Sequence, residues 1–254
     1  MSLGTLDLNC DVGEGFGAWR ISDDEAFLDI VAAANVACGF HAGDPRTMRE
    51  VCTLAVERGV AIGAHVGYRD LAGFGRRFVD VAPVELIDEL VYQLGALDAI
   101  ARSVGGRVRY VKPHGALYHA VFAHDGQASA VVEAIRRYDP QLLLLGQPSS
   151  RLFAHAMDAG LDTVVEAFAD RGYAPDGRLV PRGLPGALVT DPIQVAQQCA
   201  RLANYGELVA VDGTVLRLQP GSICVHSDTP GGAAIAMAVR TALQDAGVTS
   251  GTFA

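Results

Sequence analysis

Short hydrophobic runs alternate along this chain with longer segments in which hydrophobic residues recur at helical spacing. The runs lack the in-and-out alternation of a strand with one solvated face, so they predict parallel strands buried on both sides. The predicted strands span residues 6–11, 34–38, 60–65, 108–115, 142–145, 163–168 and 222–228, with a weaker one at 187–189.

Helices are predicted in the intervals between most of these runs. The longest begins at Pro83, carries one stripe of aliphatic side chains and ends at the Gly105-Gly106 pair. The other predicted helices span residues 23–33, 45–58, 127–138, 150–159, 192–204 and 231–246.

Two helix starts have clear chemical signals. Ser22, with Glu25 three positions later, matches a capping box. Asp44 and Pro45 match an N-cap and the first residue of a helix. His41 lies between two glycines just before this second start, so the sequence offers its ring between a strand end and a helix N-terminus, where an anion is favoured.

The repeated strand–helix alternation favours an α/β fold in a single domain over residues 1–254. A distorted, closed or nearly closed (β/α) barrel of the TIM-like kind is the first choice, and an open doubly wound sheet is the second. The segment 209–219 departs from the alternation. Two short runs around Asp212-Gly213 predict a β-hairpin there, which we expect to be an excursion from the barrel.

Polar residues gather at the ends of the predicted strands. In a (β/α) barrel these ends meet at one rim, where active sites lie. The set comprises Asn9, Asp11, His41, Asp44, His65, Lys112, His114, Asp170, Arg171, His226 and Asp228. It holds four of the seven His in the chain, which favours a shared pocket over four separate structural histidines. We expect His119, His124 and His155 to lie at the surface.

Several candidate residues also have a purely structural explanation. Asp44 can serve only as a helix cap. The Arg76-Arg77 pair can be solvated or, beside its glycine-rich turn, can close over a phosphate. Glu166 can simply pair with Arg171. Each of these alternatives stays open at the level of the sequence.

The candidate residues favour hydrolysis of a C–N bond. Two His and one Asp can hold a divalent metal, Asp or His can act as a general base, and Lys or Arg can stabilise an oxyanion or a phosphoryl group. Lys112 lies on an inward-facing strand, where an ammonium is costly unless an anion uses it. The sequence has no GxSxG or GxxxxGK[ST] motif, and Cys38 and Cys224 lie inside apolar runs, so no Ser or Cys nucleophile is indicated.

Composition narrows the range of partners and compartments. The net charge is −9 without a basic cluster, which disfavours nucleic acid and anionic membranes as partners. The five Cys are widely spaced without a CxxC pair, as expected for reduced thiols in a cytoplasmic protein. We see neither a signal peptide nor an apolar run long enough to span a membrane.

Five motifs carry a resemblance to a known family. They read DLNCDVGE at 7–14, NVACGFHAGDP at 35–45, VKPHGALY at 111–118, EAFADR at 166–171 and CVH at 224–226. Together they resemble the LamB/YcsF family. Two motifs depart from it, because the family usually has GAHPGYPD where this chain has GAHVGYRD at 63–70, and CVHGD where it has CVHSD at 224–228. Both departures keep the His and the Asp.

The resemblance implies a distorted (β/α) barrel related to the glycoside hydrolase/deacetylase superfamily. It also implies ATP-dependent opening of 5-oxo-L-proline to L-glutamate, with release of ADP and phosphate, in a 5-oxoprolinase assembled with partner subunits B and C. The cofactor would be ATP with Mg²⁺. An additional divalent metal would be held by Asp11, His41 and His65, and homo-oligomerisation stays open.

Within this hypothesis the candidate residues take roles. Lys112 and Arg171 would stabilise the developing phosphate or oxyanion, Asp11 with His41 or His65 would position and deprotonate water, and His114 or His226 would return a proton to the nitrogen. Substrate contacts are expected from Asn9, Glu14, Asp44, Arg77 and Asp228.

Two alternatives remain. One is a metal-dependent amide or carbohydrate deacetylase on the same barrel, active without ATP or partners. The other is a non-catalytic subunit that only binds 5-oxoproline.

Overall fold

Seven parallel strands form a closed barrel in the computed structural model, which describes residues 6–229, 231–248 and 251–254. The strand order around the barrel is β1-β2-β3-β4-β5-β6-β9. The bounds are β1 Asp7–Val12, β2 Ala33–Ala37, β3 Ala61–Val66, β4 Val108–Pro113, β5 Leu143–Gly146, β6 Thr163–Phe168 and β9 Ser222–Val225. The predicted barrel is therefore confirmed. The alternative of an open sheet is wrong, because β9 pairs with both β1 and β6 and leaves no edge between them.

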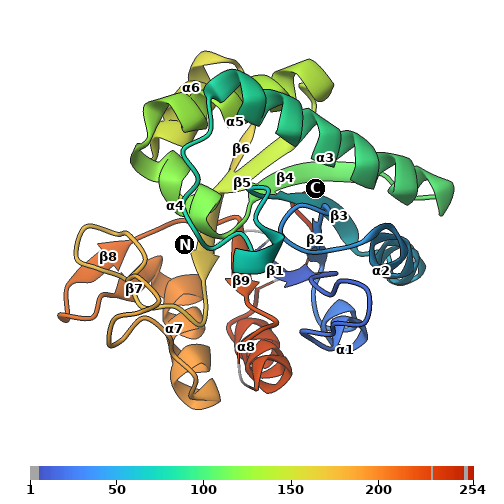
Figure 1. Cartoon of the computed structure of the whole chain (residues 1–254). Coiled ribbons are helices and arrows are strands. Elements are labelled where there is room, and N and C mark those ends of the chain that lie inside the picture. Colours follow the sequence, from blue (N-terminus) through green and yellow to red (C-terminus); the bar gives the residue numbers. More distant parts are fainter. Residues whose placement is uncertain (1–5, 230, 249–250) are drawn as a thin grey trace.

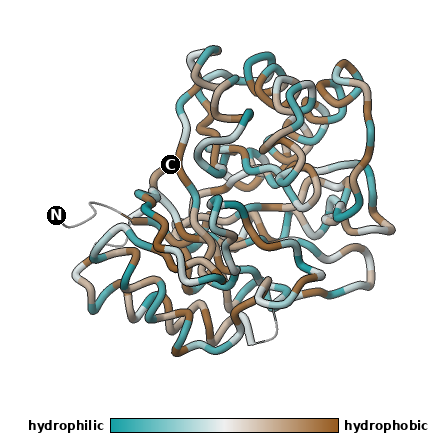
Figure 2. The backbone as a smooth tube through the Cα atoms, turned by 90° about the vertical axis from the view of Figure 1, so that its left-hand side faces the viewer, coloured by the Kyte–Doolittle hydropathy of each residue, from teal (hydrophilic) through white to brown (hydrophobic). Residues whose placement is uncertain are grey.

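Helices pack around the outside of the barrel (Figure 1). Their bounds are α1 Asp24–Leu28, α2 Pro45–Arg58, α3 Pro83–Ser103, α4 Gly115–Ala123, α5 Asp125–Tyr138, α6 Arg151–Asp158, α7 Pro192–Tyr205 and α8 Gly232–Asp245, with a short 3-10 helix η1 at Leu71–Gly73. Each of the longer helices buries one stripe, and Figure 2 shows hydrophobic and hydrophilic stretches alternating along them. This amphipathic pattern is what allows helices to cover a fully buried sheet.

The strands form where small and β-branched residues are buried on both faces. All residues of β1, β2 and β9 are buried. Because every strand is parallel, all carboxyl ends lie at the same end of the barrel. The polar residues at these ends are therefore brought to one rim.

The first helix differs from the prediction. It covers only Asp24–Leu28 rather than 23–33, because β2 already begins at Ala33. The predicted capping box is wrong. The side chain of Asp23 accepts from the Ala26 amide, while the Ser22 hydroxyl donates to Asp24. An Asp at the cap position competes directly with Ser for the same free amides.

Two further elements differ from the prediction. Helix α4, Gly115–Ala123, follows directly after β4 and has no marked polar face, so it gave no amphipathic signal. The segment 187–189 makes only an isolated bridge between Leu188 and Arg171, and it is not a barrel strand. A buried helix and a lone bridge both escape recognition by hydrophobic periodicity.

The antiparallel pair β7 (Glu207–Val209) and β8 (Val215–Arg217) lies outside the barrel, beside α7 (Figure 1). Its turn contains Gly213 at φ 90° and is held by the Thr214 amide, which donates to the Asp212 carboxylate. Across the described residues, no helix is both long and apolar enough to cross a membrane.

Candidate active site

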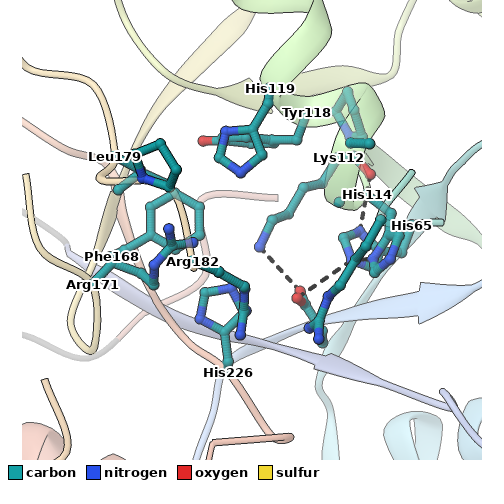
Figure 3. A pocket seen from close by; sticks show the side chains of 16 residues that line it. His65, Lys112, His114, Tyr118, His119, Phe168, Arg171, Leu179, Arg182 and His226 are labelled. Carbon is teal, nitrogen blue, oxygen red and sulfur yellow. Dashed lines mark hydrogen bonds and ion pairs between the residues drawn. The ribbon is translucent and has the colours of Figure 1, made fainter. Parts of the chain in front are cut away.

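A cavity of about 250 Å³ opens at the carboxyl end of the barrel strands. Its walls come from β1, β3, β4 and β6, from the turn after β9 and from the long loops that follow β3 and β6. Polar and charged side chains dominate it, namely Asp11, His65, Arg76, Lys112, His114, His119, Arg171, Arg182 and His226. Figure 3 shows Lys112 between the His65–His114 pair and a group formed by Phe168, Arg171 and His226.

Lys112 is the buried cation at the base of this cavity, with 2% of its surface exposed. Its Nζ lies 2.9 Å from Oε1 of Glu166 and 3.0 Å from Oδ1 of Asp11. Burial opposes its charge, but the two carboxylates raise the pKa of Lys112 well above its ordinary value, so the side chain is an ammonium. The sequence-based alternative that Glu166 pairs with Arg171 is wrong, because Glu166 holds Lys112.

Two asparagines hold these charges in place below the cavity. Asn35 donates to Oδ1 of Asp11 and to Oδ1 of Asn9, each over 2.7 Å. Asn9 in turn donates to Glu166 over 3.2 Å and to the Ser222 hydroxyl over 2.7 Å. Asn9 is fully buried and does not line the cavity, so in this structure it orients the ion pairs from beneath.

A cluster of one carboxylate and three imidazoles forms the wall beside Lys112. Glu14, His41, His65 and His114 each offer one ligand atom, and all four atoms lie within 4.8 Å of one another. This buried cluster could bind a metal ion. Burial lowers the pKa of His41 and of His114 well below the usual value and raises the pKa of Glu14.

Glycines allow the cluster to pack this closely. A Cβ on Gly75 would lie 2.7 Å from Cδ2 of His114 and 2.8 Å from Cβ of His41. One on Gly67 would lie 3.0 Å from Nδ1 of His41. The glycine-rich loop after β3 therefore lies directly against the imidazoles, which explains its composition.

A second group of potential metal ligands consists of Asp11, Cys224 and His226. The Lys112 ammonium already donates to two of them, over 3.0 Å to Asp11 and 3.1 Å to the Cys224 sulfur. Burial raises the pKa of the Cys224 thiol well above its usual value, so it is a poor nucleophile and a poor ligand. A resident cation therefore already occupies this second group.

On the opposite wall, His226 is oriented by a buried carboxylate. Nδ1 of His226 lies 2.8 Å from Oδ1 of Asp170, and the Thr229 hydroxyl donates to Oδ2 of Asp170 over 2.6 Å. The His226 ring also stacks on Phe168 with ring centroids 5.3 Å apart. Because Nδ1 faces the carboxylate, Nε2 is left available to the cavity.

Arginines line the remaining walls of the cavity. Arg171 is 2% exposed and donates to the carbonyls of Ala187 and Val180, and burial lowers its pKa to about 10. Arg76 donates to Asp228 over 2.5 Å, and Arg182 lies 3.8 Å from the same carboxylate. These guanidiniums make the cavity suitable for an anionic group.

Three candidate residues lie elsewhere. Asp44 caps α2 through the amides of Arg46 and Thr47, and these hydrogen bonds account for its pKa of about 2 despite a small opposing effect of burial. Arg77 is bound to Asp70 and does not line the cavity. Asp228 touches the cavity through Arg76 rather than lining it.

Sequence reasoning missed several lining residues. His119, predicted at the surface, lines the cavity from α4, and burial lowers its pKa to about 4. Arg182 lies in the loop after β6, where no local pattern distinguishes it from a solvated arginine. The i, i+4 spacing from Gly115 to His119 becomes informative only once 115–123 is known to be a helix.

Comparisons with known proteins agree with this architecture. A family model described as the LamB/YcsF family matches residues 6–254. The A subunit of a 5-oxoprolinase from Mycobacterium avium (strain 104) is 57% identical over 243 residues, which are 96% of each chain. The corresponding protein from Kocuria rhizophila is 55% identical over 249 residues, covering 98% of this chain and 99% of the relative.

Solved structures give the same result. The lactam utilization protein from Thermus thermophilus superimposes with a TM-score of 0.93 at 40% identity, covering 98% of this chain and 100% of that one. A family 4 carbohydrate esterase from Streptomyces lividans reaches a TM-score of 0.50 at 13% identity, covering 100% and 95%, which shows a shared fold only.

Proposed function

The chain belongs to the LamB/YcsF family, and on this basis and on the geometry of its cavity we propose that it is the lactam-opening subunit of a 5-oxoprolinase. The reaction is the ATP-dependent hydrolysis of 5-oxo-L-proline to L-glutamate, ADP and phosphate. One observation carries the proposal above all. A charged Lys112, held by Asp11 and Glu166, is buried beside two imidazole-bearing walls in a cavity sized for a small molecule.

An unstrained lactam is a poor electrophile, so its opening needs an activated oxygen. Transfer of a phosphoryl group from ATP to the lactam oxygen makes the carbon electrophilic. Water then adds, the C–N bond breaks as the nitrogen gains a proton, and a second water hydrolyses the resulting acyl phosphate to glutamate and phosphate. The chain's own task is to stabilise charge on the oxygen side and to move protons on the water and nitrogen sides.

Specific residues suit each task. The Lys112 ammonium, together with the guanidinium of Arg171, faces the developing negative charge. Asp11, whose pKa is held well below its usual range by His65 and Lys112 against the effect of burial, is an ionised carboxylate able to orient water. His226, aligned by Asp170, supplies the proton for the leaving nitrogen.

ATP with Mg²⁺ is a substrate of the assembled enzyme in this proposal. Because the relatives are named as one lettered subunit of their enzyme, further subunits are implied, and we propose that subunits B and C complete the enzyme. The arginines Arg76, Arg171 and Arg182 fit a phosphoryl group at the cavity. We further propose a single-domain chain that works in the cytoplasm, where ATP is supplied.

Product analysis tests the proposal. The chain is mixed with its two partner subunits, 5-oxoproline and Mg-ATP, and glutamate and phosphate are measured together. We expect both products in equal amounts, and a loss of at least about a hundredfold in rate for Lys112→Ala. The surface variant Arg136→Ala serves as a matched control. Wild-type turnover by Lys112→Ala would exclude the assignment of Lys112.

A second candidate function is a metal-dependent hydrolase of amides or acetylated sugars, favoured by the buried His/Glu cluster and by the barrel shared with a carbohydrate esterase. It predicts activity by the chain alone, without ATP. A third is a binding subunit that only delivers 5-oxoproline. It predicts calorimetric binding of 5-oxoproline, with complex turnover unaffected by single His substitutions.

A further inference from the structure

Two imidazoles in the cavity wall point unprotonated nitrogens at each other. Nδ1 of His65 lies 3.1 Å from the Lys112 carbonyl oxygen, and Nε2 of His114 lies 2.8 Å from the Phe74 carbonyl oxygen. A carbonyl only accepts, so each of these nitrogens donates its proton. In the neutral rings the other two nitrogens, Nε2 of His65 and Nδ1 of His114, carry lone pairs, yet they lie only 2.9 Å apart.

Two more groups converge on the same point without a partner. Oε1 of Glu14 lies 3.4 Å from Nδ1 of His114 and 4.0 Å from Nε2 of His65. It is buried and has no hydrogen-bond partner among the residues that the structure describes. Within the same described set, both ring nitrogens of the fully buried His41 also lack one. Buried polar atoms left in this state require an explanation.

We propose that Glu14, His65 and His114 bind one divalent transition-metal ion. Nitrogen and oxygen ligands about 2.0–2.2 Å from a tetrahedral ion lie roughly 3.3–3.6 Å from one another. The three separations of 2.9, 3.4 and 4.0 Å between the ligand atoms bracket this range. The backbone carbonyls that accept from the far nitrogens fix both rings, as outer partners of metal-bound histidines do.

The donor set also selects the kind of ion. Two imidazoles with one carboxylate suit Zn²⁺ and similar transition metals, whereas Mg²⁺ and Ca²⁺ prefer oxygen ligands. His41 is not a ligand in this arrangement. Its ring lies parallel to that of His114, with centroids 3.7 Å apart and planes 4° apart, so an ion in the plane of one ring lies outside the plane of the other. This ligand set replaces the combination of Asp11, His41 and His65 expected from the sequence.

The position of the ion gives it a role in the proposed lactam opening, on which this inference rests. His65 and His114 also line the cavity, and Oδ2 of Asp11 lies 3.3 Å from Nε2 of His65. Three protein ligands leave a coordination position open. Such an ion lowers the pKa of a bound water or polarises an oxygen. The carboxylate of Asp11 is placed to orient that water toward Lys112.

Metal binding is measured directly on the full chain alone. The protein is stripped with a chelator, dialysed and titrated with ZnCl₂ by calorimetry, and Co²⁺ is followed by its visible absorption. We expect one Zn²⁺ per chain with submicromolar affinity, and at least a hundredfold weaker binding for the near-isosteric Glu14→Gln variant. His155→Gln removes a surface His–Asp pair and is the matched control, with unchanged affinity expected.

Circular dichroism and thermal unfolding verify that each variant is folded. If Glu14→Gln fails to fold, His114→Gln replaces it with the same expected loss. Absence of stoichiometric Zn²⁺ binding by the wild type overturns the proposal, as does full retention of binding by folded Glu14→Gln. Loss of binding in His155→Gln would also overturn it, because the ion would then sit at the surface.

A separate assay distinguishes this inference from the proposed function. Lactam turnover is measured in the complex with its partner subunits, before and after metal removal. Stoichiometric Zn²⁺ on the chain with no glutamate formed by the complex would reject the proposed function and leave the metal site standing. Glutamate formation by a complex that binds no Zn²⁺ would reject the metal site and leave the function standing.

Discussion

Nζ of Lys112 lies 2.9 Å from Oε1 of Glu166, although their strands, β4 and β6, are separated by β5. The side chains are 2% and 0% exposed, so the pair spans the closed interior of the barrel. Oε2 of Glu166 has no hydrogen-bond partner among the described residues. The carboxylate is therefore retained mainly for its effect on the lysine, because a buried ion pair gains little net stability by itself.

Removing one partner of this pair should be costly. We expect Lys112→Met to lower the free energy of unfolding by about 3–5 kcal/mol, because Asp11 and Glu166 are left as uncompensated buried charges. The double variant Lys112→Met/Glu166→Gln should be clearly less destabilised than the sum of the two single variants. Urea unfolding of all four proteins measures this coupling. Strict additivity would show that the two charges do not depend on each other.

Arg76 should act on substrate binding. Its guanidinium lines the cavity beside Asp228, whereas the neighbouring Arg77 is held by Asp70 outside it. We expect Arg76→Ala to raise KM of the assembled enzyme for 5-oxoproline about 10- to 100-fold, the loss of one charge-assisted contact. Arg77→Ala should have a smaller effect and the surface variant Arg136→Ala none. A larger effect of Arg77→Ala would favour the assignment made from the sequence.

Asp170 should act through His226. Substituting Asn for Asp170 removes the carboxylate that fixes the ring and its protonated nitrogen. We expect kcat of the assembled enzyme to fall by about 100-fold or more while KM changes little. Thr229→Val, which removes only one hydrogen bond to that carboxylate, should lower kcat less than about tenfold. Unchanged kcat in Asp170→Asn would remove His226 from proton transfer.

Asp7 should give the protein a specific pH dependence. Burial raises its pKa to about 7, although hydrogen bonds from Phe253 and Ser222 oppose the shift. The folded chain then holds a proton that the unfolded chain releases near pH 4, so the free energy of unfolding falls as pH rises from about 4 to about 7, by as much as about 4 kcal/mol.

The near-isosteric Asp7→Asn variant isolates this effect. Its side chain stays neutral, so we expect it to lack that part of the pH dependence and to be more stable than the wild type above about pH 7. Urea unfolding of both proteins at about pH 5 and about pH 8 provides the comparison. Equal changes in stability between the two pH values would mean that Asp7 is ionised in the folded chain.

Gly63 should be irreplaceable for a steric reason. An added Cβ would lie 2.1 Å from the Tyr110 ring, whose hydroxyl donates to Asn35 inside the barrel. We expect Gly63→Ala to cost about 3 kcal/mol or more in unfolding free energy, at the upper end of overpacking. Gly183→Ala, where the added atom meets open space, is the matched control. Similar stability of the two variants would show that Tyr110 can move aside.

The sequence was sufficient for the repeating architecture. Buried runs such as 60–65 and the caps at Asp44 and Asp191 are local signals, and each matches the observed element to within a few residues. Helix α4 and the non-strand at 187–189 were not predictable, because a helix without a polar face and a single bridge lack a period of their own. The strand-end His and the Lys could be singled out for the same reason as the strands.

What the sequence could not determine is which of these polar residues meet. It placed His41, His65, Lys112, His114 and His226 at strand ends, because hydrophobic patterning fixes where each strand stops. Only closure of the barrel brings Glu166 onto Lys112, seats Glu14 among three imidazoles and turns Arg77 away while Arg76 faces the cavity. These contacts join residues far apart in the chain, and their partners are selected by strand order, register and packing, none of which a local pattern encodes.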